Sequence, residues 1–66
     1  MRLIVNGFER EVRDGATVAD LLDESGEPPR HVIVEVNGIY LPCAEHAARL
    51  LGDGDRVEII LPAFGG

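Results

Sequence analysis

The stretch Arg56-Val57-Glu58-Ile59-Ile60-Leu61 decides the fold, because it is the last strand that the sequence predicts and the one without a hairpin partner. Apolar and charged residues alternate at its start, which is typical of a strand with one buried face. Asp53-Gly54-Asp55 before it is typical of a turn. Pro62 after it lacks a backbone donor, so sheet pairing is expected to stop there. The rest of the fold depends on which strands pair with this one.

Two Asn-Gly pairs, Asn6-Gly7 and Asn37-Gly38, indicate two hairpins upstream of this strand. Each follows a run of apolar residues, and Asn-Gly favours a type I′ turn because both central residues of that turn adopt positive φ. Pro42 shortens the last of the four strands, because proline has no N–H to pair. The predicted strands cover residues 2–6, 8–13, 32–36 and 39–41.

One helix of about ten residues is predicted between the two hairpins. Thr17 is a good N-cap, and Asp20, three residues later, can complete a capping box. Gly26 is placed to end the helix in the left-handed conformation. Three apolar residues share one face of this helix: Val18, Leu21 and Leu22.

Residues 42–52 predict a short second helix or 3-10 turn, since Pro42 can begin one and alanine and leucine recur there with weak helical spacing. One main helix cannot cover two separate sheets, so both hairpins are expected to share one sheet. The final strand can join that sheet only between the hairpins, parallel to the first strand. This arrangement is the α+β β-grasp, or ubiquitin-like, fold: a mixed sheet of about five strands with one main helix.

Chain length sets the domain organisation. The chain has 66 residues, which is enough for one domain. We expect a β-grasp domain over residues 1–61 and a flexible C-terminal tail over residues 62–66. A domain of this size buries only roughly 60% of the surface that its unfolded chain exposes, so nearly every branched apolar side chain is needed for the core. Little interior is left for a buried active site, and we predict that the protein is not an enzyme.

The charge excludes several classes of partner. Twelve acidic residues outnumber six arginines, no lysine is present, and the net charge is −6. Nucleic acid and anionic membrane surfaces attract clustered basic residues, so neither is expected as a partner. The apolar stretches are far shorter than the ~18–20 residues that span a bilayer. With a single cysteine, Cys43, the chain cannot form an internal disulfide, and we predict a cytoplasmic protein.

Strand alternation leaves isoleucines on the sheet face opposite the helix. If the odd-numbered residues of the first and last strands, Leu61 included, point toward the helix, then Ile4 and Ile60 point away from it. Ile33 on the third strand points the same way, and these strands are neighbours in a β-grasp sheet. We therefore predict one apolar row that docks a protein partner. The alternative is that strands simply favour isoleucine, exposed or not.

Cys43 and His46 are three residues apart and can share one helix face. A catalytic Cys–His pair also needs an orienting third group and a pocket, and a metal site needs more ligands than these two. We therefore predict no catalytic residue and no metal ligand. Cys43 is interpreted as an incidental, partly buried thiol and His46 as a surface imidazole. The alternative for Cys43 is uptake of sulfur as a persulfide.

Most acidic residues fall in predicted caps, turns and the outer face of the helix. In these places they favour solubility and capping, and the alternative is that they steer the protein toward a basic partner. They are Asp14, Asp20, Asp23, Glu24, Glu27, Asp53 and Asp55.

The sequence ends in Gly65-Gly66 after the irregular run Pro62-Ala63-Phe64. Glycine has no Cβ, so two of them can pass a narrow channel and adopt the backbone angles that a partner's active site requires. Pro62 biases the residue before it toward the extended region, so the tail is expected to project. Phe64 is interpreted as an aromatic anchor in a partner groove, or as a side chain that folds back on the sheet edge.

With these features the chain resembles the ThiS-like sulfur carrier proteins of thiamine biosynthesis, a group of ubiquitin-like proteins. The resemblance covers the whole chain, and the length fits as well. It rests on Val5-Asn6-Gly7, Asp14-Gly15-Ala16-Thr17-Val18-Ala19-Asp20-Leu21-Leu22, Val34-Glu35-Val36-Asn37-Gly38, Asp53-Gly54-Asp55-Arg56-Val57-Glu58-Ile59 and Gly65-Gly66.

The resemblance implies a carrier that is a co-substrate of other enzymes and binds no cofactor itself. An adenylating enzyme, similar to ubiquitin-activating enzymes, would use ATP to attach AMP to the Gly66 carboxylate. A sulfur donor, either a cysteine desulfurase or a persulfide protein, would displace AMP and leave a thiocarboxylate. Thiazole synthase would then accept that sulfur. Gly65, Phe64 and Pro62 would form the part of the tail presented to the partner.

The tail also resembles that of a second family of carrier proteins. Pro62 and Phe64 are similar to the proline-containing tails of molybdopterin-synthase small subunits, and carriers of the same build serve cysteine or methionine assembly. The alternatives are therefore a sulfur carrier for one of these pathways, a ubiquitin-like protein modifier, or a plain interaction domain.

Overall fold

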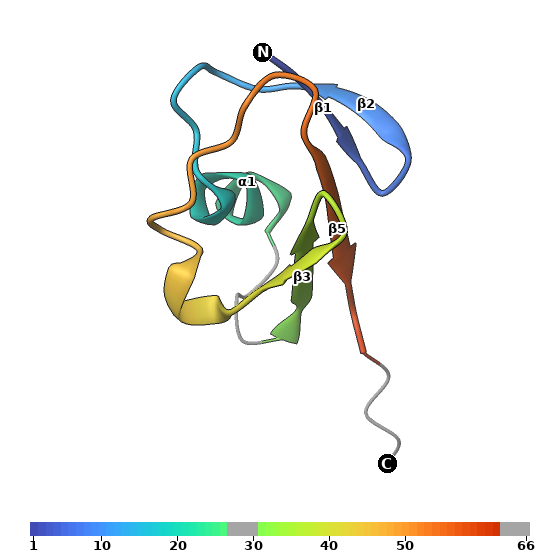
Figure 1. Ribbon diagram of the computed structural model, residues 1–66, viewed down its shortest axis with the longest axis vertical. Helices are drawn as coiled ribbons and strands as arrows, with labels where there is room; N and C mark the ends of the chain where they lie inside the picture. Colours follow the sequence, from blue (N-terminus) through green and yellow to red (C-terminus); the bar gives the residue numbers. More distant parts are fainter. Residues whose placement is uncertain (27–30, 63–66) are drawn as a thin grey trace.

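The computed structural model describes residues 1–26 and 31–62, and its elements follow the predicted order (Figure 1). The strands are β1 (Arg2–Val5), β2 (Phe8–Glu11), β3 (Ile33–Val36), β4 (Ile39–Leu41) and β5 (Arg56–Ile60). The helices are α1 (Val18–Ser25) and the 3-10 helix η2 (Cys43–Glu45). Neither helix in this part of the chain is long and apolar enough to cross a membrane.

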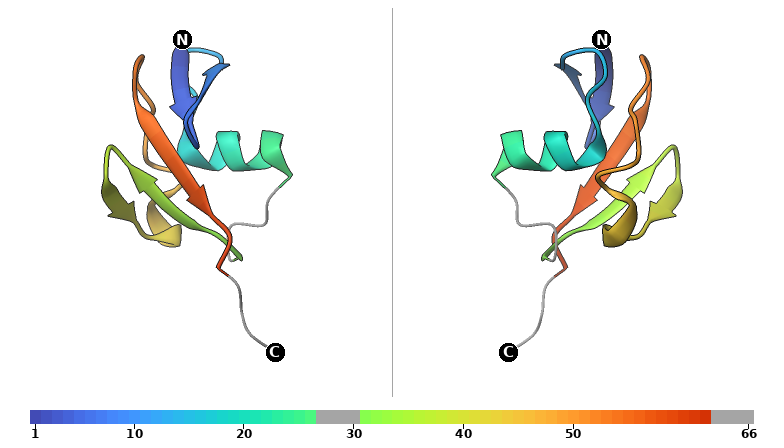
Figure 2. Two further views of the ribbon diagram at one scale, coloured as in Figure 1. Left: turned by 90° about the vertical axis from the view of Figure 1, so that its right-hand side faces the viewer. Right: turned by 90° about the vertical axis from the view of Figure 1, so that its left-hand side faces the viewer.

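All five strands form one mixed sheet in the order β2-β1-β5-β3-β4, and α1 crosses one face of it (Figure 2). β5 lies in the middle, parallel to β1 and antiparallel to β3. This confirms both the predicted place of the last strand between the hairpins and the α+β β-grasp arrangement.

The two hairpin turns hold Asn and Gly in the left-handed region. The φ angles are 50° at Asn6 and 86° at Gly7 in the first turn, and 53° at Asn37 and 82° at Gly38 in the second. Few residues other than Asn and Gly adopt this conformation without strain. The two Asn-Gly pairs therefore specify the turns, as the sequence predicts.

The backbone N–H groups at the start of α1 find acceptors in the capping box and in the loop after η2. Thr17 Oγ1 accepts the N–H of Asp20 at 3.2 Å, and Asp20 Oδ2 accepts the N–H of Thr17 at 2.9 Å, which is the predicted capping box. The first two N–H groups of the helix donate to the carbonyls of Arg49 and His46 at 3.0 and 3.1 Å. The loop after η2 thus supplies acceptors for N–H groups that a helix leaves free.

The core lies between α1 and the sheet face that it covers. Leu21 and Leu22 of the helix are fully buried in one cluster with Leu3, Val34 and Val57 of the three middle strands. Burying a side chain of this size stabilises the fold by about 1.5–3 kcal/mol relative to leaving it exposed. The predicted alternation holds over these strands, so their covered face is apolar.

Leu61 departs from the predicted alternation. β5 ends at Ile60, and Leu61 is 61% exposed. Alternation directs side chains only while a strand continues, so the expectation that Leu61 joins the covered face is wrong.

Asp55 holds the turn that leads into β5. Its Oδ2 accepts the N–H of Gly52 at 2.7 Å, and its Oδ1 accepts a hydrogen bond from Asn37 Nδ2 at 3.0 Å. Burial raises the pKa of Asp55, but these two hydrogen bonds and the nearby charge of Arg49 together outweigh it. The pKa of Asp55 therefore lies below its ordinary value.

We predict that acid destabilises the protein partly through Asp55. A carboxyl group whose pKa is lower in the folded chain stabilises the fold above the unfolded pKa, about 3.9 for aspartate, and this contribution is lost as pH falls through the folded pKa. Asp55→Asn should lower the melting temperature at pH 7 and flatten its decline below about pH 4. Thermal unfolding at a series of pH values measures both, and parallel curves for the two proteins would contradict the assignment.

Candidate functional site

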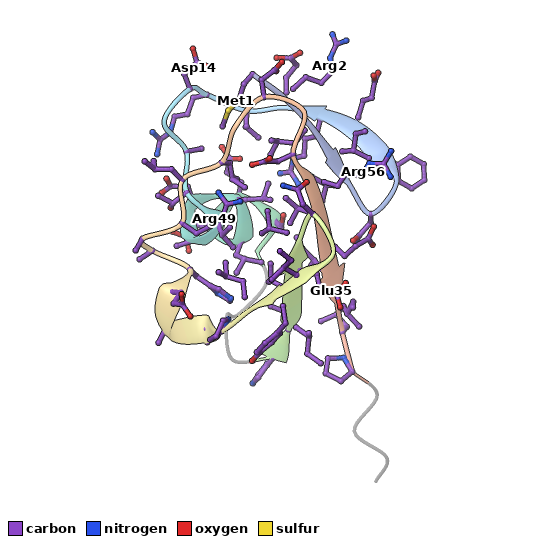
Figure 3. The ribbon with its side chains drawn as sticks, viewed as in Figure 1. Met1, Arg2, Asp14, Glu35, Arg49 and Arg56 are labelled. Carbon is purple, nitrogen blue, oxygen red and sulfur yellow. The ribbon has the colours of Figure 1, made fainter. Side chains whose placement is uncertain are left out.

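The tail begins where the central strand ends. β5 points away from the end of the molecule that holds Met1, so Ile60 lies at the opposite end (Figures 1 and 3). Pro62 is the last described residue and is half-buried. Phe64, Gly65 and Gly66 lie outside the described residues, so their predicted roles stay predictions.

The open face, the side of the sheet opposite α1, carries the three isoleucines in two separate places. Ile33 and Ile60 are direct cross-strand partners, and they are 38% and 41% exposed. Ile4 is half-buried and lies opposite Arg56 in the register of β1 and β5. The predicted single row is wrong, because the register shifts Ile4 four residues along β5 from Ile60. The use of these residues for docking stays a prediction.

Two carboxylates lie between the isoleucine pair and Ile4. Glu35 and Glu58 are direct cross-strand partners on β3 and β5, and Tyr40 lies opposite Glu35 on β4. No basic group of the described residues lies within 4.0 Å of either carboxylate. Figure 3 shows Arg56 toward the start of β5 and Glu35 further along, toward the tail. Like charges directly opposite one another destabilise a sheet, so this pair is unfavourable in the isolated chain.

The acidic residues at the other edge of the open face lie beside a basic group. Arg2 Nε donates to Glu11 Oε1 at 3.2 Å, and Arg2 Nη1 lies 3.9 Å from Glu9 Oε1. The unpaired negative charge of the open face is therefore concentrated at Glu35 and Glu58, beside the isoleucine pair.

The two turn asparagines bind the central strand through their side chains. Asn6 Oδ1 accepts the N–H of Ile59 at 2.7 Å, and Asn6 Nδ2 donates to the carbonyl of Ile59 at 3.3 Å. Asn37 Oδ1 accepts the N–H of Arg56 at 3.0 Å. The sequence reasoning treated both residues only as turn formers. Only the sheet order, which places β5 beside both turns, reveals these contacts.

The structure reverses the predicted exposure of Cys43 and His46. Cys43 is exposed, whereas His46 is 3% exposed and its Nε2 lies 3.2 Å from the carbonyl oxygen of Leu41. The predicted exposures are wrong because η2 ends after one turn and the following loop directs the imidazole of His46 inward. Among the described residues, no group of three or more His, Cys, Asp or Glu side chains could hold a metal ion.

Several predicted cap and turn acids have structural partners. Asp14 Oδ1 accepts from the Met1 amino group at 3.2 Å, and Asp53 Oδ1 accepts the N–H of Arg2 at 2.7 Å. Asp20 caps α1 as predicted, whereas Asp14 and Asp53 bind the amino terminus and β1 from their turns. Glu27 lies outside the described residues.

We predict that Glu58→Gln raises the free energy of unfolding by about 0.5 kcal/mol at low ionic strength, because it removes the repulsion from Glu35. The gain should disappear at high salt, where exposed charges are screened. Urea unfolding at two salt concentrations measures this change in the free energy of unfolding. Glu11→Gln is the matched control: its carboxylate is paired with Arg2, so stability should not rise. Equal effects of the two substitutions would contradict the repulsion.

The sequence of the chain is similar to a known protein family and to a curated protein. The sequence model of the ThiS family matches residues 3–66. A protein of Paramagnetospirillum magneticum named thiazole synthase is 39% identical over 66 residues, which are 100% of this chain and 20% of that protein. The chain thus spans about a fifth of the length of this curated relative.

Solved structures of similar proteins have the same fold. The crystal structure of the thiamine biosynthesis protein ThiS from Geobacter metallireducens matches with a TM-score of 0.87 and 33% identity, over 100% of both chains. The solution NMR structure of a thiamine biosynthesis protein from the same organism matches with a TM-score of 0.83 and 33% identity, over 100% of this chain and 88% of that one. The likeness covers the full length of the chain in both cases.

Proposed function

The chain belongs to the ThiS family, and from this we propose that it is a sulfur carrier of thiamine biosynthesis whose sulfur is held on the carboxylate of Gly66. The observation that carries the proposal is the family match through Gly66, on a fold whose central strand leads into the Gly65-Gly66 tail. The protein is then a substrate of other enzymes rather than an enzyme. Its location in the cytoplasm stays a prediction from composition.

The proposed chemistry takes place on the terminal carboxylate. An adenylating enzyme uses ATP to form an acyl-adenylate at Gly66 and releases pyrophosphate. The mixed anhydride makes the carbonyl carbon electrophilic, and a persulfide attacks it with AMP as the leaving group. A second thiol then cleaves the S–S bond of the acyl disulfide and leaves the thiocarboxylate. The carrier supplies no cofactor, since ATP is bound by the activating partner.

Thiazole synthase is the proposed acceptor of the sulfur. The Paramagnetospirillum magneticum protein of that name contains a segment that matches the whole of this chain at 39% identity. A segment that shares a polypeptide with a synthase is held close to it, which supports transfer between the two.

The open face is the proposed docking face. Ile33 and Ile60 offer apolar surface next to the tail, and Glu35 and Glu58 offer two unpaired negative charges beside it. A partner that covers this face therefore has to provide an apolar contact and a basic side chain together. Such a basic group would relieve the repulsion between the two carboxylates and favour the correct register of docking.

The carrier chemistry is tested by intact mass. The 66-residue protein is incubated with its host's adenylating enzyme, ATP, cysteine and a cysteine desulfurase, and we expect one oxygen to be replaced by one sulfur. A variant that lacks Gly66 should remain unchanged. ATP-dependent adducts with other proteins would instead indicate a protein modifier, and an unchanged mass would refute the proposal.

The docking face is tested with a matched pair of substitutions. Ile60→Glu should lower kcat/KM for ATP-dependent activation at least about tenfold, because it places a charge in the apolar contact. Leu50→Glu introduces the same charge at a residue that is 60% exposed but pairs with Thr17 at the start of α1, away from the open face. This control should be activated normally. Equal rates for both variants, with both folded by circular dichroism, would exclude the open face.

A further inference from the structure

The second half of β5 has a strand on one side only. β1 pairs with β5 at Ile4–Arg56 and Val5–Val57 and then turns away, whereas β3 pairs with β5 as far as Ile60. The backbone groups of β5 point to the two sides in alternation, and the carbonyls of Asp55 and Val57 accept from the β1 side. The next residue that points to that side is Ile59, which lies beyond the end of β1.

Asn6 supplies the hydrogen bonds that β1 no longer provides. Its backbone N–H donates to the carbonyl of Val57 at 2.9 Å. Its side chain then accepts the N–H of Ile59 at 2.7 Å and donates to the carbonyl of Ile59 at 3.3 Å. A carboxamide carries one acceptor and one donor group side by side, as a peptide unit does. Asn6 therefore extends the ladder on this side of β5 by one residue, as far as Ile59.

The turn explains why asparagine can do this. Asn6 has a φ of 50°, in the left-handed region that asparagine tolerates better than other non-glycine residues. In this conformation the chain reverses while the side chain still reaches β5. Serine carries its donor and acceptor on a single oxygen, alanine carries neither, and aspartate provides acceptors only.

We infer that Asn6 is a positioning residue for the carrier reaction: by holding Ile59 on the side of β5 that β1 no longer covers, it helps to fix the direction in which the chain leaves the sheet after Ile60. The inference rests on the proposed function, because direction matters only if Gly66 must reach a partner's active site. Four residues follow Pro62, and whatever their conformation they span at most about 14 Å. With so short a reach, an error in direction at Ile59 displaces the reacting carboxylate from the attacking geometry.

Asn37 provides a matched control within the same strand. It has a φ of 53°, precedes Gly38, and accepts the N–H of Arg56 at 3.0 Å. It thus also binds β5 through its side chain, but at the first residue of the strand, remote from the tail, and its Nδ2 donates to Asp55 Oδ1 instead of to a carbonyl of β5. Substitution by glycine removes either side chain while keeping the left-handed turn accessible.

The first measurement is structural. Amide hydrogen exchange in Asn6→Gly should accelerate at Ile59 by at least about fivefold, the effect of losing one hydrogen bond. The N–H order parameter of Leu61 should fall below its value in the natural protein. Asn37→Gly should leave both unchanged and accelerate exchange at Arg56 instead. Thermal unfolding of each variant shows whether the two differ in global stability.

The second measurement is kinetic and uses the adenylating enzyme with ATP–pyrophosphate exchange. The docking face is intact in Asn6→Gly, so we expect kcat to fall at least about fivefold with little change in KM, because the carboxylate is misplaced in the bound complex. Asn37→Gly should behave as the natural protein. Asn6→Asp keeps the acceptor and loses the donor, so it should lie between the natural protein and Asn6→Gly.

The outcomes separate this inference from the proposed function. If the natural protein is activated but both glycine variants are activated equally well, Asn6 has no positioning role. Equal decreases of kcat in both glycine variants indicate a loss of stability alone and also overturn the inference. If the natural protein is not activated at all, the proposed function fails and the role of Asn6 in it fails as well.

Discussion

The central position of β5 is the constraint on which the rest of the structure depends. This strand bonds to β1 on one side and β3 on the other, and its Val57 is fully buried beneath α1. Without it, the two hairpins would have no common sheet and α1 no single face to cover. The same strand leads toward the C-terminus, so a strand held from both sides is also the base of the proposed reactive end.

This arrangement suits a protein that is acted on by others. A domain of 66 residues uses its branched apolar side chains for one core, and Leu21, Leu22 and Val34 are fully buried there. In the proposed function, recognition is left to the surface and reaction to the tail. The sheet face opposite α1 is the proposed recognition surface, because burial of the other face leaves it free to carry an apolar pair and two carboxylates.

The distribution of charge on that face is unfavourable for stability and is accounted for by the proposed docking. Arg2 and the Met1 amino group lie beside Glu9 and Glu11 at the β2 edge, whereas Glu35 and Glu58 face one another with no basic group of the described residues within 4.0 Å of either carboxylate. A like-charge pair in direct register weakens a sheet. Retaining it beside Ile33 and Ile60 is understandable if a basic partner group neutralises it on docking, in keeping with the net charge of −6.

The sequence by itself determined the elements, their order and the sheet topology. Asn-Gly turns, the Thr17–Asp20 capping box and Gly26 are local signals that act over a few residues, and one helix with two hairpins leaves a single place for the last strand. Only the tertiary structure decided the register of β1 against β5, which separates Ile4 from Ile60, and the inward position of His46. It also decided that Asn6 binds Ile59, 53 positions away in the chain. Such contacts depend on how strands align in space, and no local pattern of residue types specifies that alignment.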